Sequence, residues 1–552
     1  MRAKVLFYLF CITLAAWNCS SDSTQKASRV VIGVPADVEN LNPLFAFGLL
    51  EGSIREIMYP GLVIHKWDDA SGEMIPSPSI AQKWEWSNDS SSITFYLRED
   101  VFWSDSVKLT SEDIVFSFDI YSDPLVSSTF YGGFDNFYTD GEQRIQLDKS
   151  FEVLSPTKIR IKFKPNTSPT LFDIDMPVLP KHVLSKIPRR DLSTTNIEKI
   201  LVTSGAYKLS DWKRNESISL KAVTNSFLAS SDMVKELIFK IIPDENSRIT
   251  QLRKGEIDLI EDVGTEFISD LKKEPQIKVT SRTGRDYDFI GWNNIDPKSF
   301  GAKKTMKPNK FFGSANVRKA LSYAINKAEI LEEYLHGYGQ LSFSPLSPIF
   351  TNYYSNEIKP YEFNPTKAKE LLSAEGWLDK NNDGVIEKNN VNFSFTLYIG
   401  SGNSRREYAA TIVRNNLKAI GIEVKIETLE MSTFVNKIFE RELDAFIAGW
   451  TVPIPLDLQP YWHSNFTKSP LNLYGFNQPE IDRILDDLQK EKSLDVKKQL
   501  YKNFQKLIHE FEPVTFLYWL DIVTAYNARI KNITINPLGA IQHCWEWRVN
   551  GN

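Results

Sequence analysis

Residues Ile80–Asp119 read IAQKWEWSNDSSSITFYLREDVFWSDSVKLTSEDIVFSFD and place two different hydrophobic periods side by side. From Ile93 to Leu97 large apolar residues occupy every second position, which predicts a strand with one buried face. In the LTSEDIVFSFDIY segment, Thr110 and Asp113 have the spacing of a capping box at the start of an amphipathic helix. The stretch therefore predicts a strand followed closely by a helix, which favours a mixed α/β chain.

The same mixture continues toward the C-terminus, with helix boundaries marked by capping residues. Asn364 precedes a proline at the first helical position and Gly376 follows the helix, while Asn326 begins another. In PDENSRITQLRKGEIDLI, Gly255 ends a helix and an apolar strand follows. We expect an α/β or α+β protein of several domains.

Composition limits the classes of function. The chain has 552 residues and a formal net charge of -5, so it lacks the basic surface expected of a nucleic-acid-binding protein. Aromatic residues make up 12%, a surplus that often lines binding surfaces. The three cysteines, Cys11, Cys19 and Cys544, leave no pair for a structural disulfide within the folded part.

The N-terminus has the features of an export signal. Arg2 and Lys4 precede the short apolar run VLFYLFCITLAAW, which predicts a signal peptide over residues 1–18. Cys19 and a polar tether over residues 19–29 resemble the processing site of a bacterial lipoprotein, although Trp17 stands where a small residue is usual. A plain secretory signal remains the alternative. Either way, the sequence predicts a periplasmic or cell-surface protein.

Five segments in succession, beginning with the quoted stretch, resemble the family 5 extracellular solute-binding proteins, which are the peptide- and nickel-binding components of ABC importers. The later blocks are SGAYKLSDWKRNESISL, PDENSRITQLRKGEIDLI, VRKALSYAINKAEI and FNPTKAKELLSAEGW. The resemblance covers about Val30 to Asn527. It implies a two-lobed periplasmic-binding-protein fold of cluster C, with an extra domain on the first lobe and a two-strand hinge.

Mapped onto this chain, the resemblance predicts a discontinuous first lobe. The boundaries are residues 30–58, 180–286 and 513–552 for lobe I, 59–179 for the extra domain, and 287–512 for lobe II. The two chain crossings fall near YDFIGWNN and EPVTFLYWL, which read as apolar extended segments suited to a hinge.

The expected function is that of a monomeric receptor that closes on a peptide and delivers it to permease subunits of an ABC importer. The N-terminal signal predicts a membrane connection through a lipid anchor only, and neither a nucleic acid nor a cofactor is expected. The chain shows no phosphate loop and no nucleophile elbow, so we expect no enzyme activity. Two alternatives stay open: a non-peptide ligand such as an oligosaccharide or metal chelate, and an exported enzyme or chaperone on the same scaffold.

The segment AGWTVPIPLDLQPYWHSN, Ala448–Asn465, is the main candidate for a ligand site. In peptide-binding relatives an aspartate a few residues after the Gly-Trp pairs with the ligand's ammonium. Here Pro453 stands at that place and Asp457 is the only acid of the segment, so Asp457 either replaces the anchor or is structural. The predicted ligand contacts of this region are Trp450 and Asp457, with Tyr461, Trp292 and Asn293 as weaker candidates.

A second candidate region lies near the start of the folded chain, in ADVENLNPLFAFGLLEGSIREIMYPGLV. The resemblance implies that it faces the ligand, and Phe45, Phe47 and Glu51 are the predicted contacts. The alternatives are core packing for both phenylalanines and solvent exposure for Glu51. His463 is the one histidine that we single out, for a metal carried by the ligand. The sequence predicts no protein metal site, and DKNNDGVIE is interpreted as an Asp-Gly turn because a calcium loop needs a glutamate where Asn390 stands.

Overall fold

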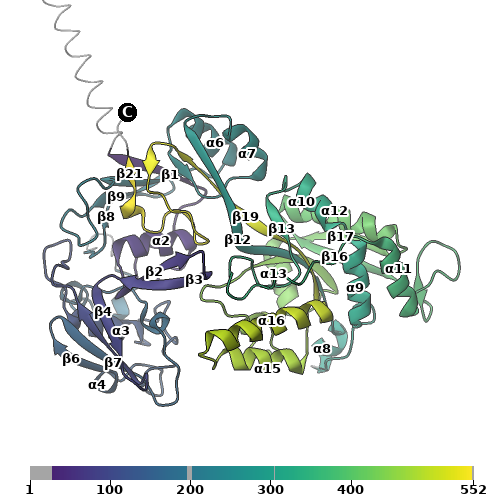
Figure 1. Cartoon of the computed structure of the whole chain (residues 1–552), viewed down its shortest axis with the longest axis horizontal. Coiled ribbons are helices and arrows are strands. Elements are labelled where there is room, and N and C mark those ends of the chain that lie inside the picture. The colour runs from purple at the N-terminus through teal and green to yellow at the C-terminus, as the bar shows by residue number, and fades with distance from the viewer. Residues whose placement is uncertain (1–27, 196–201, 304, 550–552) are drawn as a thin grey trace, which may run out of the picture. The chain divides into compact units, whose positions relative to one another are not determined.

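The computed structural model describes residues 28–195, 202–303 and 305–549. The predicted signal peptide, Cys19 and most of the tether lie outside the described residues. The chain forms two compact units (Figure 1). Of the described residues, the first unit comprises those within 28–66, 75–280 and 523–549, and the second comprises those within 67–74 and 281–522.

The main sheet of the first unit is mixed. Strand β1 (Arg29–Val34) runs parallel to β10 (Glu236–Ile241) and to β11 (Leu259–Ile260). Beyond β10 lie β9 (Ser217–Ala222) and β8 (Tyr207–Lys213), both antiparallel to their neighbours. The last residues of β19 (Val514–Asn527) pair with β11. The pairing places the C-terminal end of β1 beside the end of β11, where the chain turns toward Glu261.

The stretch Ile80–Asp119 contributes two strands to a second, antiparallel sheet of the first unit. Its strand order is β4-β5-β7-β6, and Ile93, Phe95 and Leu97 of β5 are buried as predicted. The backbone N–H of Thr110 donates to Asp113 Oδ2 at 2.9 Å, so the predicted capping interaction is present. The bounds are β4 (Ala81–Trp86), β5 (Ser92–Leu97), β6 (Phe151–Ser155), β7 (Lys158–Lys162) and α3 (Ser111–Tyr121).

Short helices cover the first unit. Helix α6 begins after Asp244, which accepts from the Ser247 N–H, and ends at Gly255, whose φ of 67° favours a residue without a Cβ. The helix bounds are α2 (Leu49–Met58), α4 (Leu147–Ser150), α5 (Lys181–Leu184), α6 (Glu245–Lys254) and α7 (Thr265–Leu271), with 3₁₀ turns η1 (Leu171–Ile174), η2 (Arg189–Asp191) and η4 (Cys544–Glu546). Strands β20 (Ile530–Lys531) and β21 (Arg548–Val549) form a small ribbon.

The remaining strands of the mixed sheet belong to the second unit. Strands β16 (Ser394–Gly400) and β17 (Glu423–Leu429) are parallel, β18 (Ala445–Thr451) joins β16, and β12 (Ile277–Trp292) pairs antiparallel with β18. Strand β13 (Gly339–Leu341) pairs with β19, and β14 (Glu387–Lys388) with β15 (Val391–Asn392). This sheet carries the segment from Ala448 onward at the end of β18.

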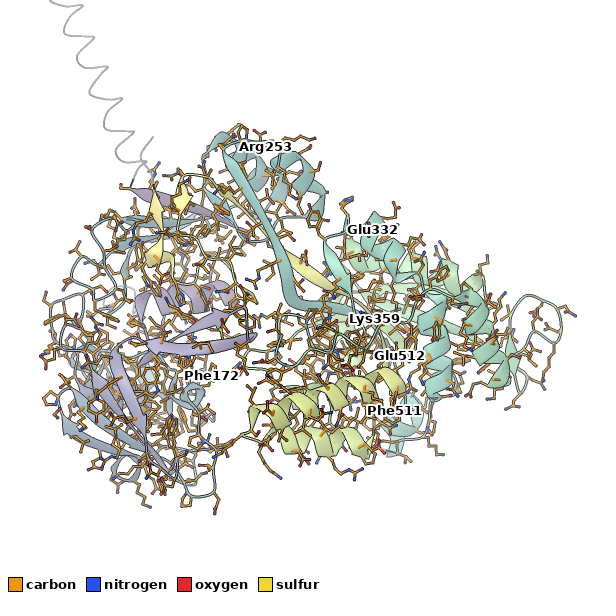
Figure 2. The ribbon with its side chains drawn as sticks, in the orientation of Figure 1. Phe172, Arg253, Glu332, Lys359, Phe511 and Glu512 are labelled. Atoms are coloured by element: carbon orange, nitrogen blue, oxygen red, sulfur yellow. The ribbon has the colours of Figure 1, made fainter. Side chains whose placement is uncertain are left out.

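Helices of the second unit begin where the sequence predicts caps. Asn326 Oδ1 accepts from the Glu329 N–H and Asn364 Oδ1 from the Lys367 N–H. Helix α16 ends at Phe511, followed by the buried Glu512, which accepts from Ser322 Oγ at 2.6 Å (Figure 2). The bounds are α8 (Pro297–Lys303), α9 (Ala315–Ala324), α10 (Lys327–Glu333), α11 (Pro365–Ala374), α12 (Ser404–Lys418), α13 (Met431–Phe439), α14 (Gln459–Trp462), α15 (Pro479–Leu488) and α16 (Leu494–Phe511).

Two long strands carry the chain from one unit to the other. The boundary after Thr280 falls within β12 and the boundary after Ile522 falls within β19. The hairpin of β2 (Val63–Asp68) and β3 (Glu73–Pro78) also contains a boundary on each strand. The predicted lobe boundaries stay predictions. Among the described residues, no helix combines the length and apolar character needed to cross a membrane.

Candidate functional site

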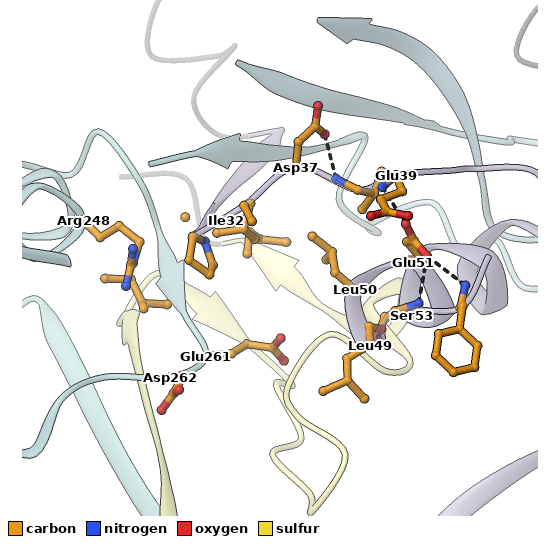
Figure 3. A pocket seen from close by; sticks show the side chains of 18 of the residues that line it. Ile32, Asp37, Glu39, Leu49, Leu50, Glu51, Ser53, Arg248, Glu261 and Asp262 are labelled. Carbon is orange, nitrogen blue, oxygen red and sulfur yellow. Dashed lines mark hydrogen bonds between the residues drawn. The ribbon is translucent and has the colours of Figure 1, made fainter. Parts of the chain in front are cut away.

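The first unit contains a cavity of about 640 Å³ beside the end of β1 (Figure 3). Its wall is formed by Ile32–Glu39, by Phe47–Glu51 at the start of α2, and by Ile260–Asp262 after β11. Ser53, Arg248 and Leu538 complete the lining. The volume lies within the range of roughly 300–1,000 Å³ that is typical of small-molecule sites. The predicted residues Phe47 and Glu51 both line this cavity.

Glu51 organises the loop that leads into α2. Its Oε1 accepts the backbone N–H groups of Glu39 at 2.6 Å and Asn40 at 3.1 Å. Its Oε2 accepts those of Phe47 and Gly48, both at 2.8 Å. Burial acts to raise the pKa of Glu51, but the four N–H donors outweigh it and the pKa is lowered. Both oxygens are thus occupied by the loop, a role that neither sequence interpretation included.

The two predicted phenylalanines of this loop have different surroundings. Phe45 is half-buried against the core of the first unit. Phe47 is 88% exposed and its neighbour Leu49 is 81% exposed, although both are large and apolar. Two such side chains on the rim of one cavity offer apolar contact surface to a ligand.

Glu261 is a carboxylate set into the cavity wall. Its Oε1 accepts the backbone N–H of Ala540, and that of Ile541 at 3.0 Å, whereas Oε2 has no hydrogen-bond partner among the described residues. Burial raises the pKa of Glu261, and the backbone donors oppose this only in part. Figure 3 shows its carboxylate directed into the space toward Leu49. The signal in the sequence is an acid pair, Glu261 and Asp262, directly after a short buried strand.

Acids outnumber bases in the lining of this cavity. The lining residues include five acids, Asp37, Glu39, Glu51, Glu261 and Asp262, and one base, Arg248. That cation, Arg248, is 7% exposed, and its Nη1 donates to the carbonyls of Ile242 at 2.7 Å and Pro243 at 2.9 Å. The cavity is therefore electronegative.

In the second unit, the segment after β18 holds two of the predicted aromatic residues together. Trp450 pairs with Tyr287 across β12 and β18, and its ring meets the ring of Tyr461 edge-on at a centroid distance of 5.1 Å. The indole Nε1 of Trp450 is buried and has no hydrogen-bond partner among the described residues. The segment thus presents a fixed aromatic pair and one unused donor.

Asp457 lies just before α14, and half of its carboxylate is engaged. Oδ1 accepts the Gln459 N–H at 3.0 Å and Gln489 Nε2 at 2.9 Å, while Oδ2 has no partner in the described part of the chain. Burial and then the charge of Asp457 raise the pKa of Tyr461. Asp457 therefore has a structural role and an oxygen left for a ligand.

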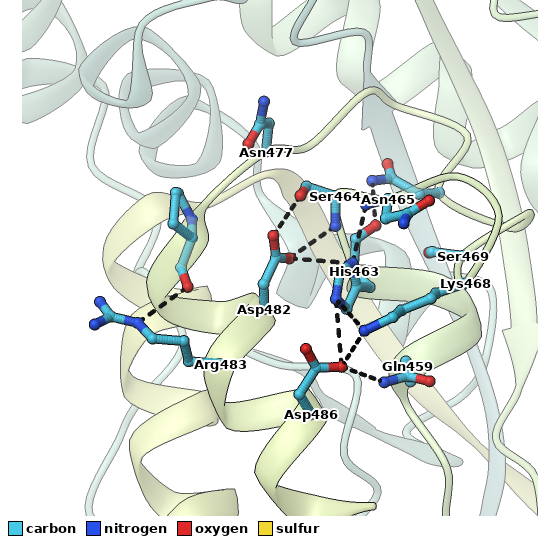
Figure 4. Close-up of polar contacts among 12 residues, drawn as sticks. Gln459, His463, Ser464, Asn465, Lys468, Ser469, Asn477, Asp482, Arg483 and Asp486 are labelled. Carbon is cyan, nitrogen blue, oxygen red and sulfur yellow. Dashed lines mark hydrogen bonds and ion pairs between the residues drawn. The ribbon is translucent and has the colours of Figure 1, made fainter.

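His463 is enclosed by partners from its own unit (Figure 4). It is 5% exposed, its Nδ1 accepts the Asn465 N–H at 2.9 Å, and its ring nitrogens lie 3.5 Å from Asp482 and from Asp486. Lys468 donates to Asp486 in the same cluster. Within the described ranges, no group of three potential ligands could hold a metal ion.

Trp292 and Asn293 lie in the interior of the second unit. Both are 0% exposed. Trp292 Nε1 donates to Thr515 Oγ1 at 2.9 Å, and Asn293 Nδ2 donates to the carbonyls of Arg441 and Leu443 at 2.9 and 3.2 Å. Neither side chain presents a surface to a ligand in this structure.

One charged cluster in the second unit was not predicted from the sequence. Asp288, 1% exposed on β12, accepts from Arg405 Nε at 2.7 Å and from Arg406 Nη2 at 2.9 Å, and Tyr518 OH lies 3.3 Å away. Burial acts to raise the pKa of Asp288, but the two guanidinium groups hold it below its usual range. The sequence did hold one indication of this cluster: an acid within the apolar YDFIGW strand needs a cationic partner when it is buried.

Comparison with protein families gives one match over most of the chain. The model for bacterial extracellular solute-binding proteins, family 5, middle part, matches residues 76–472. The oligopeptide-binding protein AppA of Bacillus subtilis is 27% identical over 535 residues, which cover 96% of this chain and 93% of that protein. Heme-binding protein A of Haemophilus influenzae is 25% identical over 486 residues, covering 84% and 82%.

Solved structures give the same fold. The structure of Bacillus subtilis AppA in complex with a nonapeptide aligns with a TM-score of 0.71 at 25% identity and covers 95% of this chain and 99% of that one. NikZ from Campylobacter jejuni, in complex with Ni(L-His), aligns with a TM-score of 0.71 at 24% identity, covering 95% and 99%. The predicted mixed α/β binding-protein fold is confirmed.

Proposed function

Because the chain belongs to the bacterial extracellular solute-binding proteins of family 5, we propose that it captures peptides outside the cytoplasm for an ABC importer. Family membership confirms the predicted class, a substrate-binding protein of an ABC importer rather than an enzyme or chaperone. Peptides are the proposed ligands because the relative with 27% identity is an oligopeptide-binding protein.

The observation that carries the proposal is the open cavity of the first unit. It combines the loop that follows β1, residues 35–39, with two exposed apolar side chains, those of Phe47 and Leu49. Main-chain groups of such a loop can hydrogen-bond a peptide main chain whatever its sequence, and an apolar rim accepts side chains. Glu51 contributes by fixing the loop, not by direct contact.

In the second unit we assign ligand contacts to Trp450, Asp457 and Tyr461, whose side chains are partly exposed. The free Oδ2 of Asp457 would accept the ammonium of a peptide in place of the acid that Pro453 replaces. The buried Trp292 and Asn293, and the half-buried Phe45, are left out of this assignment because their surroundings supply their contacts.

We further propose that the mature receptor is monomeric, is held at the membrane by a lipid on Cys19, and passes its ligand to permease subunits. The support is the charged and apolar order of residues 1–18 followed by cysteine. If Cys19 carries a lipid, Cys19→Ser should release the protein from the membrane fraction. If the signal is a plain secretory one, the native protein and Cys19→Ser should divide in the same way between the membrane and soluble fractions.

A non-peptide ligand is the second candidate, since Pro453 occupies the expected position of the ammonium-binding acid. Relatives at similar identity carry the names heme-binding protein A and NikZ, the latter solved with Ni(L-His). Mass spectrometry of the compound that co-purifies with the protein separates this candidate from the first.

The test is thermal stabilisation of ligand-free protein by pools of di- to hexapeptides. Binding at about 100 times the dissociation constant adds roughly 2.7 kcal/mol of stability, which corresponds to a shift of several degrees. No shift with any pool would overturn the peptide assignment, although not the receptor class.

Two variants refine the test. Asp457→Ala is expected to weaken binding of free peptides by about tenfold, the value of a charge-assisted bond, without affecting N-acetylated peptides. Asp487→Ala removes an exposed acid of the same unit and serves as the matched control. Equal affinities of Asp457→Ala and the native protein for free peptides would assign Asp457 a structural role only.

A further inference from the structure

We infer that the first-unit cavity binds a cationic group on an apolar stem, such as a lysine or arginine side chain of the ligand, with Glu261 as its partner. This inference rests on the proposed function and adds a ligand preference that the family resemblance does not supply.

The first support is the charge of the lining. Five acidic residues and one arginine are among the residues that line a space of about 640 Å³. A concave surface with an excess of one sign concentrates the potential inside it and attracts the opposite charge. An anionic ligand group would meet this potential unfavourably.

The second support is the distribution of free oxygen atoms among those acids. Both Glu51 oxygens accept backbone N–H groups. Asp37 accepts from Trp212 Nε1 at 3.0 Å and from the Asn215 N–H at 2.8 Å. Glu261 is the acid of the lining that is both set into the wall and left with an open oxygen, because Ala540 and Ile541 occupy only its Oε1.

Arg248 does not neutralise this acid. Its guanidinium donates to the carbonyls of Ile242 and Pro243, and no carboxylate lies within ion-pair distance of it in the described part of the chain. Its position in the lining makes an anion the competing ligand, which the experiment below distinguishes.

The third support is the apolar rim. Phe47 and Leu49 are 88% and 81% exposed, and Leu50 lines the cavity beside them. Lysine and arginine carry three or four methylene groups below their charge and pack these stems along apolar surface. The face of a phenylalanine ring also attracts a cation. Rim and wall together therefore match a side chain that is apolar along its length and positive at its tip.

Glu261→Gln is a suitable variant because the structure shows what it preserves. The amide oxygen of glutamine can accept the Ala540 and Ile541 N–H groups as Oε1 does now. The amide nitrogen then replaces the open Oε2, so the ligand-facing acceptor becomes a donor without a change of shape. Glu216→Gln removes one charge from an exposed turn of the same unit, outside the cavity, and is the matched control.

The experiment measures the affinities of the full mature protein for two tripeptide pools that differ only in lysine against norleucine. We expect the lysine pool to bind at least about tenfold more tightly, as a charge-assisted bond allows. Glu261→Gln should abolish this preference while leaving norleucine peptides at their native affinity, and Glu216→Gln should leave both unchanged. A third pool with glutamate tests the competing anion.

Each remaining outcome overturns a defined statement. Equal binding of the lysine and norleucine pools, or tighter binding of the glutamate pool, overturns the cation preference and leaves the peptide function in place. A lysine preference that survives in Glu261→Gln overturns the role of Glu261. Absence of binding to all three pools overturns the peptide function and this inference together.

Discussion

Asp288 in the second unit and Glu261 in the first are both acids set into the protein, yet burial has opposite consequences for them. Asp288 receives two guanidinium groups and a tyrosine hydroxyl, and its pKa is lowered. Glu261 receives only two backbone N–H groups, both on one oxygen, and its pKa is raised. The first has a complete set of internal partners, and the second does not.

The difference distinguishes an acid that holds a fold together from one that is available to a ligand. Removing a partner from a compensated buried ion pair leaves an unpaired charge and costs stability. An incompletely paired carboxylate at a cavity can instead gain a partner when a ligand arrives. Three measurements test this contrast.

The largest effect is expected from Asp288→Asn. The variant leaves Arg405 and Arg406 without a counter-charge, and disrupting a buried pair costs about 3–5 kcal/mol. Because these arginine side chains keep 24% and 20% of their surface exposed, we expect the lower part of that range. Glu261→Gln should cost less than about 1 kcal/mol, since its backbone hydrogen bonds survive. Hydrogen exchange of amides in β18 and in β11 measures the two effects separately, and equal losses would contradict the contrast.

A smaller effect is expected from Gly449→Ala, which crowds the same cluster from β18. An added Cβ would lie 2.5 Å from Arg406 Nη2 and from Asp288 Oδ1, and 2.7 Å from the Tyr287 carbonyl. Overpacking of this kind costs about 1–3 kcal/mol. Gly52→Ala in α2 meets nothing within 4 Å and should instead stabilise slightly, because alanine favours a helix. Thermal unfolding compares the stabilities of the two variants. An unchanged stability of Gly449→Ala would show that the side chains around Asp288 can move to make room for the added methyl group.

The smallest effect is the dependence of stability on pH. A lowered folded-state pKa means that Asp288 stabilises the protein above its unfolded pKa, and this contribution is lost as pH falls through the folded value. A raised pKa gives Glu261 the opposite sign: its contribution is complete below the unfolded pKa and is lost as pH rises through the folded value. Asp288→Asn should lose part of the fall in unfolding free energy toward acid pH, and Glu261→Gln should lose part of the fall toward higher pH. Changes of the same sign in both variants, measured by unfolding across a range of pH, would contradict the assignment.

Local patterns in the sequence were sufficient for much of the fold. The alternation from Ile93 to Leu97 and the caps at Asn364, Asn326 and Gly255 depend on residues close in the chain, and each appears in the structure as predicted. The order of the blocks then identified the family, because several spacings had to agree at once.

The site required contacts that sequence spacing does not contain. Asp288 meets Arg405 across 117 positions, and Glu261 meets Ala540 across 279, so neither environment follows from neighbouring residues. Glu51 could be named as a candidate, but its four backbone donors depend on how the loop from Glu39 to Gly48 folds back. The burial of Trp292 was likewise a property of the second-unit core, not of its local sequence.

The last residues of β19 have a consequence for the order in which the protein can fold. Ala525 and Tyr526 pair with Ile260 and Leu259, so the sheet that begins with β1 is completed by chain synthesised some five hundred residues later. During translation and export the first unit must wait with an unpaired strand while the whole second unit emerges. The edge of β11 therefore lacks its partner strand until the C-terminal strand is available, and an unpaired strand edge is a site where chains aggregate.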